Sequence, residues 1–392
     1  MPAFVASPLD PRVYQLLADA GFSDALFNPR QHWCCELVDE YVLQQTIAVV
    51  ERLGVADLLR EPRTADAILD ASGFVPAFWT PLRWLLDRLV AARLATRDAN
   101  GRYRLAAPLV RADLDPLRRE GLEADPSYAP AFALVDEAAA LYPAVARGET
   151  TGDAALLRRA GLWFAYFSNA NGYYALTNRV TAHAAAARLV DSARVLEVGA
   201  GLGSATEAFV ERLRECGTLG RLASYHVTEP VPLFRRRAER TVRAAHPDVP
   251  LAFGPLDMNA PWEEQDVAPG GADLVWGVNV FHLARDLDAA LREAFVALAP
   301  GGTLVVGEGL RPRAGEPVGT EFPFQLLESY RDVRLDPRTR STAGFLTAEE
   351  WLGALGRAGF TTLELVPDAI AIRRLYPAFL AGAVCGRRPP AA

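Results

Sequence analysis

Three closely spaced glycines behind an apolar, acid-ended segment are the residues in this sequence best suited to binding a small molecule. The run 194–203 reads Arg-Val-Leu-Glu-Val-Gly-Ala-Gly-Leu-Gly. Glycines let a chain turn sharply after a strand and bring bare backbone close to a ligand, and a helix is expected from about Ser204. The spacing therefore predicts a nucleotide-binding turn. The expected ligand contacts are Gly199, Ala200, Gly201 and Gly203.

The acidic residue of that run, Glu197, indicates which charge the ligand carries. Dinucleotide sites usually read G-x-G-x-x-G and face a pyrophosphate, beside which a carboxylate is electrostatically unfavourable. A carboxylate suits a ligand that has no phosphate and carries positive charge. S-adenosylmethionine, with its sulfonium and ammonium groups, fits that description. The alternative is a structural turn in which Glu197 pairs with an arginine.

The elements that would position this turn change in character along the chain. From residue 194 onward, short apolar strands alternate with helices, as a doubly wound parallel sheet requires. We expect strands over 194–198, 223–228, 251–253, 272–278, 303–307, 361–366 and 381–385. The sequence therefore predicts an α/β domain over 190–392.

The first half of the chain is predicted to be mainly helical. Helices are expected over 37–60, 65–71 and 76–92, followed by a hairpin with arms at 94–97 and 102–105. This order is typical of a winged-helix unit. The pattern stays helical over 108–189, with breaks expected near Pro116, Pro126 and Gly148. We therefore predict a helical cap over 1–189.

Composition argues against several classes of function. The chain of 392 residues carries a net charge of −7, and its 41 basic residues are all arginine, which disfavours a nucleic-acid partner. Its four cysteines show neither a disulfide framework nor metal-ligand spacing, so we expect no metal and a reducing, cytoplasmic setting. We see no signal segment and no uninterrupted apolar stretch of membrane-spanning length, so we expect a soluble protein without a membrane partner.

Residues 194–366 resemble a class I S-adenosylmethionine-dependent methyltransferase, and more narrowly the C-methyltransferase domains of polyketide synthases. Beyond the glycine turn, the motifs that carry the resemblance lie at 226–230, 256–259, 279–287, 298–308 and 345–360. The winged-helix unit departs from this pattern and is similar to the dimerisation module of freestanding small-molecule O-methyltransferases. Together these resemblances imply a Rossmann-like, seven-stranded class I core with a helical cap, and a homodimer.

The resemblance also assigns residues to the cofactor. It implies that Glu229 takes the ribose hydroxyls, that Asp257 is the acid on the adenine side, and that Met258 lines the adenine face. Asn279, which follows the fourth strand, is a further cofactor-binding candidate. The residues themselves leave two alternatives open: Glu229 could cap a helix, and Asp257 could form an Asx turn with the residues that follow it.

His282 and Glu308 form the candidate catalytic pair. Each follows an expected strand, the fourth and the fifth, which are neighbours in the class I order and lie about 4.8 Å apart. Ligands of open α/β sheets bind at the C-terminal strand ends, so the two side chains could meet there. In the resembling enzymes such a pair removes a proton from a carbon between two carbonyls. Histidine ordinarily titrates near neutral pH, which suits a general base; the alternative is a histidine without a role.

Four further residues are candidates for contact with the methyl acceptor. Tyr173 and Tyr174 follow an aromatic and amide-rich stretch, and could meet a sulfonium or the substrate, with core packing as the alternative. Gln325 and Tyr330 lie in the insertion 309–344, which resembles the segment where polyketide C-methyltransferases place substrate-facing aromatics.

Three functions follow from these features. The first is C-methylation of an activated carbon in a polyketide-like or peptide-like intermediate, either free or bound to a carrier protein. The second is O-methylation of a hydroxyl or carboxylate on a freestanding small molecule. The third is a non-catalytic, DNA-bound metabolite sensor, against which the acidic net charge argues.

Overall fold

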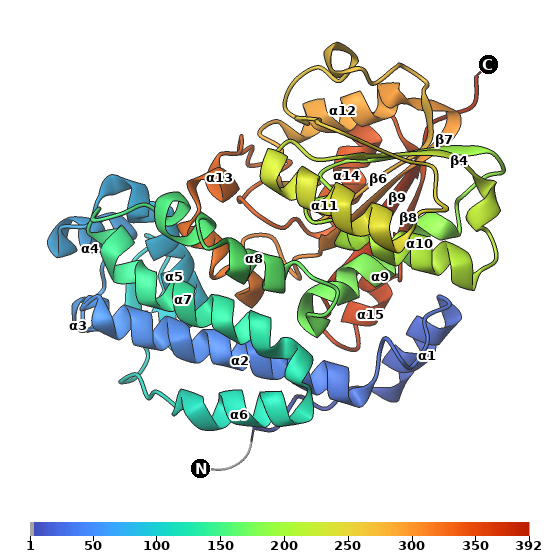
Figure 1. Ribbon diagram of the computed structural model, residues 1–392. Coiled ribbons are helices and arrows are strands. Elements are labelled where there is room, and N and C mark those ends of the chain that lie inside the picture. The colour runs from blue at the N-terminus through green and yellow to red at the C-terminus, as the bar shows by residue number, and fades with distance from the viewer. Residues whose placement is uncertain (1–3, 392) are drawn as a thin grey trace. The chain divides into compact units, whose positions relative to one another are not determined.

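The computed structural model describes residues 4–391, which separate by their internal contacts into two compact units (Figure 1). The helical unit contains the described residues up to Pro8, Asn28–Tyr166 and Gly315–Arg331. The sheet unit contains Leu9–Phe27, Phe167–Ala314 and the described residues from Asp332. This division differs from the predicted boundary after residue 189. Helices α1 (Pro11–Asp19) and α9 (Gly172–Ala186) pack with the sheet, whereas part of the predicted insertion packs with the helices.

The helical unit is formed by the following elements: α2 (Pro29–Arg52), α3 (Val55–Leu58), α4 (Ala65–Ser72), η1 (Pro76–Phe78), α5 (Trp79–Ala91), β1 (Ala95–Arg97), β2 (Tyr103–Leu105), α6 (Leu114–Ala124), η2 (Pro126–Tyr128), α7 (Ala129–Ala146), η3 (Asp153–Leu157) and α8 (Ala160–Tyr166), followed after the sheet strands by η7 (Gly319–Glu321), η8 (Phe324–Leu326) and α13 (Glu328–Arg331). Strands β1 and β2 form an antiparallel hairpin, so the helices and hairpin expected for the winged-helix unit are present.

Two details of the predicted helices differ. Helix α2 begins at Pro29, where Asn28 caps it, and ends before Gly54 rather than running to residue 60. The break expected near Pro116 lies just before it: residues 106–113 form neither helix nor strand, and Pro116 lies in the first turn of α6. A proline is tolerated there, since the first N–H groups of a helix have no partner within the helix.

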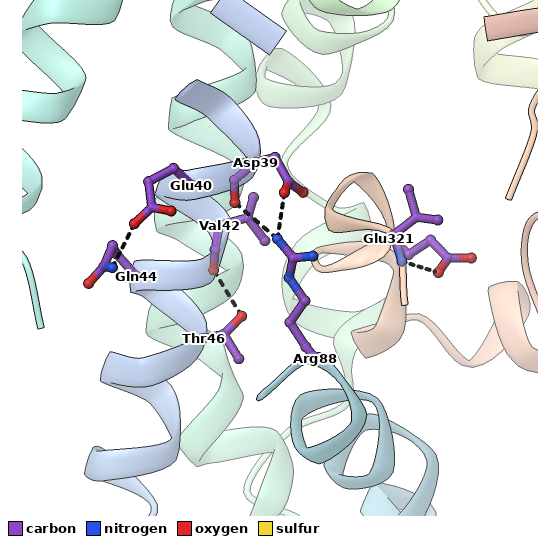
Figure 2. A network of polar contacts seen from close by, with 8 residues as sticks. Asp39, Glu40, Val42, Gln44, Thr46, Arg88 and Glu321 are labelled. Carbon is purple, nitrogen blue, oxygen red and sulfur yellow. Dashed lines mark hydrogen bonds and ion pairs between the residues drawn. The ribbon is translucent and has the colours of Figure 1, made fainter. Parts of the chain in front are cut away.

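Polar contacts join α2 to α5 inside the helical unit (Figure 2). The guanidinium of Arg88 donates to a carboxylate oxygen of Asp39 at 2.7 Å and to its backbone carbonyl at 3.3 Å. Thr46 donates to the carbonyl of Val42 within α2. The Arg88 side chain is mostly buried, so this ion pair is screened less than a surface pair would be.

A buried carboxylate fixes the segment of the insertion that joins the helical unit. Glu321 is fully buried. It accepts hydrogen bonds from the Tyr330 hydroxyl at 3.0 Å, the Val318 N–H at 3.3 Å and the Trp84 indole N–H at 3.4 Å. The Tyr142 ring stacks on Phe322, and its hydroxyl donates to the Phe322 carbonyl. Because of these contacts, the segment Gly315–Arg331 packs with the helical unit, although the strand before it belongs to the sheet unit.

We expect Tyr330→Phe to lower the free energy of unfolding by about 1–3 kcal/mol, because it removes a donor to the buried Glu321 carboxylate. Urea unfolding measures this loss, with Tyr14→Phe, at a half-buried site on α1, as the control. Unchanged stability together with a raised KM for the acceptor would instead support the substrate contact predicted for Tyr330 from the sequence.

The sheet unit contains all seven predicted strands: β3 (Ala193–Glu197), β4 (Leu222–Thr228), β5 (Leu251–Gly254), β6 (Ala272–Val278), β7 (Leu298–Gly309), β8 (Thr361–Val366) and β9 (Ala381–Arg387). They form one sheet in the order β5-β4-β3-β6-β7-β9-β8. Strand β9 runs antiparallel to both neighbours, and the other pairings are parallel. This confirms the predicted α/β fold with a seven-stranded, mostly parallel sheet.

Alternate side chains of the strands β3, β6, β7 and β9 enter two separate hydrophobic clusters. In β7, Leu304 and Val306 join one cluster and Val305 joins the other. The first cluster includes residues of α12 (Leu287–Ala297) and α14 (Ala348–Arg357), and the second includes residues of α9 and α10 (Ser204–Glu215). Since successive strand side chains point to opposite faces, helices cover the sheet on both sides (Figure 1).

The remaining elements of the sheet unit are η4 (Leu219–Arg221), α11 (Pro232–Ala245), η5 (Glu263–Gln265), η6 (Phe281–Leu283) and α15 (Ala369–Arg373). Residues of α1 enter the same cluster as α12, through Val13 and Leu17. The apolar face of α1 explains why this first helix belongs to the sheet unit and not to the predicted cap.

One segment, Pro126–Ala146, is long and apolar enough to cross a membrane by length and composition alone, with a mean hydropathy of 1.2. Half of that window is buried within the fold. It includes α7, whose residues Phe132, Leu134 and Tyr142 are core residues. A core helix of a globular protein has the same properties, so this segment is weak evidence for a membrane span.

Candidate active site

The glycine turn lies between β3 and α10, as predicted, and its three glycines all have left-handed backbone angles. A side-chain carbon at Gly199 would lie 2.2 Å from Val280, and one at Gly203 would lie 2.6 Å from Val242. A side-chain carbon at Gly201, where φ is +56°, would meet no atom within 4 Å. Gly199 and Gly203 thus allow close packing, whereas Gly201 borders open space that a ligand could fill.

Glu229 is bonded directly to this turn from the end of β4. One carboxylate oxygen accepts the Gly201 N–H at 2.9 Å, and the other accepts the Val231 N–H at 2.8 Å. Burial raises the pKa of Glu229 above its usual value, and these two N–H donors oppose the rise. Val231 is the residue that caps α11, so the structural alternative for Glu229 is realised together with its position beside the turn.

Glu197 lies deeper, with 1% of its surface exposed. Its carboxylate accepts hydrogen bonds from the hydroxyls of Thr206, at 2.8 Å, and of Tyr225. Burial raises the pKa of Glu197 to about 7, against the lowering effect of the two hydroxyls. Its partners are therefore hydroxyl groups rather than the arginine of the alternative interpretation, and the role predicted for it in cofactor binding stays a prediction.

The raised pKa of Glu197 predicts a pH-dependent stability. Between pH 4.5 and about 7 the folded state holds the proton of Glu197 more tightly than the unfolded state does. The free energy of unfolding should therefore fall as pH rises through this window, by roughly 3 kcal/mol. Urea unfolding at about pH 5 and about pH 8 should show this fall in the wild type and a smaller one in Glu197→Gln. The control is Glu211→Gln, at an exposed site on α10, which should behave like the wild type. If the free energy of unfolding of Glu197→Gln falls with pH as steeply as that of the wild type, Glu197 is not the group responsible.

His282 and Glu308 meet at the C-terminal edge of the sheet. His282 Nδ1 lies 2.7 Å from Glu308 Oε2, and the His282 backbone N–H donates to Oε1 at 3.3 Å. Glu308 has no exposed surface and His282 has 4%. Because a carboxylate only accepts hydrogen bonds, Nδ1 carries the shared hydrogen, and in the neutral ring the lone pair is on Nε2. The structure thus brings the two predicted catalytic residues together.

The short segment that carries His282 follows β6 directly. Asn279 adopts a left-handed conformation with φ of +52°, and its N–H donates to the Gly307 carbonyl of the neighbouring strand at 2.8 Å. Val280, the next residue, packs against Gly199 of the glycine turn. The Phe345 ring lies against His282, with ring centres 4.9 Å apart. The glycine turn and the dyad are therefore parts of one packed region.

Tyr174 on α9 belongs to the same region. Burial raises the pKa of its hydroxyl, and so do the negative charges of Glu197, Glu308 and Glu229, while a hydrogen bond with Asn178 opposes the rise. The Asn178 amide donates to Asn169, whose amide donates to the Ser204 carbonyl at the start of α10. This amide chain ties α9 to the helix behind the glycine turn.

The other predicted contacts are more dispersed. Ala200 is buried and donates its N–H to the Thr228 carbonyl. Asp257 is exposed and forms the Asx turn of its alternative interpretation, accepting the Asn259 N–H at 2.9 Å. Met258 packs partly buried against the core of the sheet unit. Tyr173 is half-buried in the first turn of α9.

Gln325 and Tyr330 belong to the helical unit, where both are buried. Their role in substrate specificity stays a prediction, and the hydroxyl of Tyr330 is a donor to Glu321.

Sequence reasoning missed several residues around the dyad. Arg340 and Phe345 touch the His282 segment from a part of the chain about 60 residues later. Asn169 lies in the amide-rich stretch that the sequence analysis singled out, but its hydrogen bond with Asn178 was not predicted. Phe345 lies in a motif that carried the resemblance, whereas a single arginine among 41 gives no periodic or spacing signal.

Within residues 4–391 no group of three or more histidine, cysteine, aspartate or glutamate side chains is placed to hold a metal ion. Cys34 and Cys35 are adjacent, and burial raises their pKa values to about 11 and about 12. This favours unreactive thiols.

Known proteins resemble part of this chain in sequence. Residues 196–304 match a family model described as a methyltransferase domain. Highly reducing polyketide synthase 2 of Gibberella zeae is 32% identical over 177 residues, which are 44% of this chain and 7% of that protein. The highly reducing polyketide synthase otaA of Aspergillus carbonarius is 31% identical over 50% of this chain and 8% of that protein. The chain thus spans less than a tenth of the length of these relatives.

Solved structures resemble the chain over almost its whole length. The CurJ carbon methyltransferase superposes with a TM-score of 0.79 at 20% identity, covering 97% of this chain and 100% of that one. The citrinin polyketide synthase CMeT domain superposes with a TM-score of 0.73 at 16% identity, covering 99% of this chain and 100% of that one. These comparisons confirm the class I methyltransferase fold and the methyltransferase domain that the sequence resemblance implied.

Proposed function

We propose that this chain, which contains a methyltransferase domain, transfers a methyl group from S-adenosylmethionine to an activated carbon of a polyketide-like or peptide-like intermediate. The observation that carries the proposal is the buried pair of His282 and Glu308 at the edge of the sheet, next to the glycine turn. The polyketide synthase names among its relatives support the substrate class. The acceptor would be a free small molecule or one tethered to a carrier protein.

The residues present fit S-adenosylmethionine. Gly201 has a left-handed backbone conformation and borders open space. The space that a side chain would occupy in any other residue is therefore available to the cofactor. The Glu229 carboxylate is held beside it at the end of β4, where each oxygen keeps capacity for a further hydrogen bond. These two residues would hold the ribose end of the cofactor. No phosphate-binding cation is required, which agrees with the carboxylates at this edge.

The chain's own residues would prepare the acceptor. His282 Nε2 takes the proton from the carbon between two carbonyls, and the electron pair of that C–H bond stays on the acceptor as an enolate. Glu308 keeps the hydrogen on Nδ1 and stabilises the positive ring that results. S-adenosylmethionine, when bound, supplies a methyl group whose bond to sulfur breaks, with its electron pair left on sulfur, as the new C–C bond forms. The proton on His282 is then released to water.

O-methylation of a hydroxyl or carboxylate is the second candidate. The helices α2 to α5, which cover the predicted helices 37–60, 65–71 and 76–92, favour it together with the β1–β2 hairpin, because this order is similar to the dimerisation module of small-molecule O-methyltransferases. The same His282 would take the proton from oxygen. With this second candidate we also propose that the protein forms a homodimer through its helical unit.

The position of the methyl group in the product decides between the two candidates. Binding of S-adenosylmethionine is first measured by calorimetry; the protein is then incubated with a short β-keto thioester or a phenol, using S-adenosylmethionine with a ¹³C-labelled methyl group. The proposal predicts a carbon-bound methyl signal by NMR from the β-keto thioester. An oxygen-bound methyl signal would support O-methylation, and absence of cofactor binding would contradict both candidates.

A further inference from the structure

A buried arginine binds the backbone carbonyl of the candidate base, His282, and that of Ala284, two residues later. Arg340 has 3% of its surface exposed. One guanidinium nitrogen donates to the carbonyl of His282, and the other donates to the carbonyl of Ala284 at 2.6 Å. A guanidinium is a planar, rigid fork of donors, so it fixes the spacing and direction of two carbonyls at once.

The segment needs such a partner because η6 is only three residues long. Within it, the Leu283 N–H donates to the Val280 carbonyl and the Ala284 N–H donates to the Phe281 carbonyl. The next N–H, that of Arg285, donates to the side chain of Asn259 instead of continuing the helix. The carbonyls of His282 and Ala284 therefore rely on a donor from elsewhere, and leaving buried carbonyls unsatisfied costs about 1–3 kcal/mol each.

A tight turn from Asp336 to Arg340 positions Arg340 next to the His282 segment. The Arg340 N–H donates to the Asp336 carbonyl at 2.8 Å, and the Asp336 N–H donates back to the Arg340 carbonyl at 3.0 Å. The turn is tied to the dyad segment a second time, because the Arg334 N–H donates to the Arg285 carbonyl at 2.7 Å. The backbone at Arg340 and in the residues just before it is thus fixed.

A second buried arginine secures the rest of this segment. Arg311, just past β7, donates to the carbonyls of Phe345 at 2.7 Å and Ala343 at 3.2 Å. Phe345 in turn lies against the His282 ring. The strand that carries Glu308 and the segment 332–346 are therefore held together around His282.

From these contacts we infer that Arg340 is a positioning residue for the proposed base: its guanidinium holds the His282 turn so that Nδ1 stays aligned with Glu308. The inference rests on the proposed function. Glu308 accepts hydrogen bonds from the ring and from the backbone N–H of His282, and Arg340 donates to its backbone carbonyl. The side chain, the N–H and the carbonyl of His282 are therefore all held by hydrogen bonds. Loss of this alignment slows proton removal without touching the glycine turn.

The test compares Arg340→Met and Arg340→Lys with the matched control Arg338→Met, an exposed arginine in the same tight turn. Readouts are kcat with a short β-keto thioester, the Kd of S-adenosylmethionine by calorimetry, and Tm. Since a displacement of 1 Å can cost about 10²-fold in rate, we expect kcat of Arg340→Met to fall about 10²-fold with Kd within about twofold. Arg340→Lys should recover part of the rate, and the control should match the wild type.

A double variant separates positioning from a general structural effect. If Arg340 acts through His282, adding Arg340→Met to His282→Ala should cause no further loss of rate. A further loss of the same size, or an unchanged kcat in Arg340→Met alone, would overturn the inference. Should Arg340→Met fail to fold, Arg340→Lys decides: a lowered kcat at wild-type Tm supports the role, and a wild-type kcat overturns it. An unchanged rate in His282→Ala would instead contradict the proposed function.

Discussion

Replacing His282 by alanine is expected to lower kcat for methyl transfer by about 10²- to 10⁴-fold, the usual contribution of a general base. The affinity for S-adenosylmethionine should stay nearly the same, because the glycine turn and Glu229 are bonded to each other and not to the imidazole. Single-turnover methyl transfer and calorimetric titration measure the two quantities on the same preparation.

Glu308→Gln is the companion variant. The glutamine keeps the size of the side chain but replaces the purely accepting carboxylate that now holds Nδ1. We expect a loss of kcat comparable to or smaller than that of His282→Ala, because the base remains while its orientation and its positive form are less well stabilised. A variant of either residue that lost cofactor affinity as strongly as rate would contradict the dyad assignment.

The second large effect is expected from Gly201→Val, which should abolish binding of S-adenosylmethionine. The side chain would project from a left-handed position into the open space beside the turn and disturb the N–H that Glu229 accepts. Calorimetry should show no binding at concentrations that saturate the wild type, while circular dichroism shows an intact fold.

Gly217→Val is the matched control for this variant. Gly217 follows α10, has φ of +68°, and likewise has no atom within 4 Å of an added side-chain carbon. It therefore carries the same backbone strain in open space, away from the candidate site. Equal loss of binding in both variants would show that strain, and not the ligand space at Gly201, is responsible.

Much of the sheet unit was predictable because its signals are local. Each strand of the sheet is a short apolar run, and six of the seven predicted strands agree with the observed ones within two residues at each end; β7 alone begins earlier, at Leu298. The neighbouring positions of β6 and β7 then follow from the fold class, and with them the meeting of His282 and Glu308.

The partition of the chain was less predictable. The amphipathic pattern of helix α1 would be the same whether the helix packed on the helical unit or on the sheet unit. The three-dimensional contacts place Val13 and Leu17 in the core of the sheet unit. The segment around Glu321 follows a strand of the sheet unit, yet its buried carboxylate takes donors from Trp84 and Tyr330 in the helical unit. Periodicity reports which face of an element is apolar, not what that face packs against.

The α/β core, the glycine turn and the two residues of the dyad could be predicted from the amino-acid sequence, because a strand end, a turn and a pair on neighbouring strands are encoded over a few residues. Three features became known from the folded structure: Glu197 accepts hydrogen bonds from hydroxyls, Gly201 alone of the three glycines borders open space, and Arg340 binds the His282 turn. Such contacts join residues far apart in the chain, and their partners are set by packing geometry rather than by local spacing.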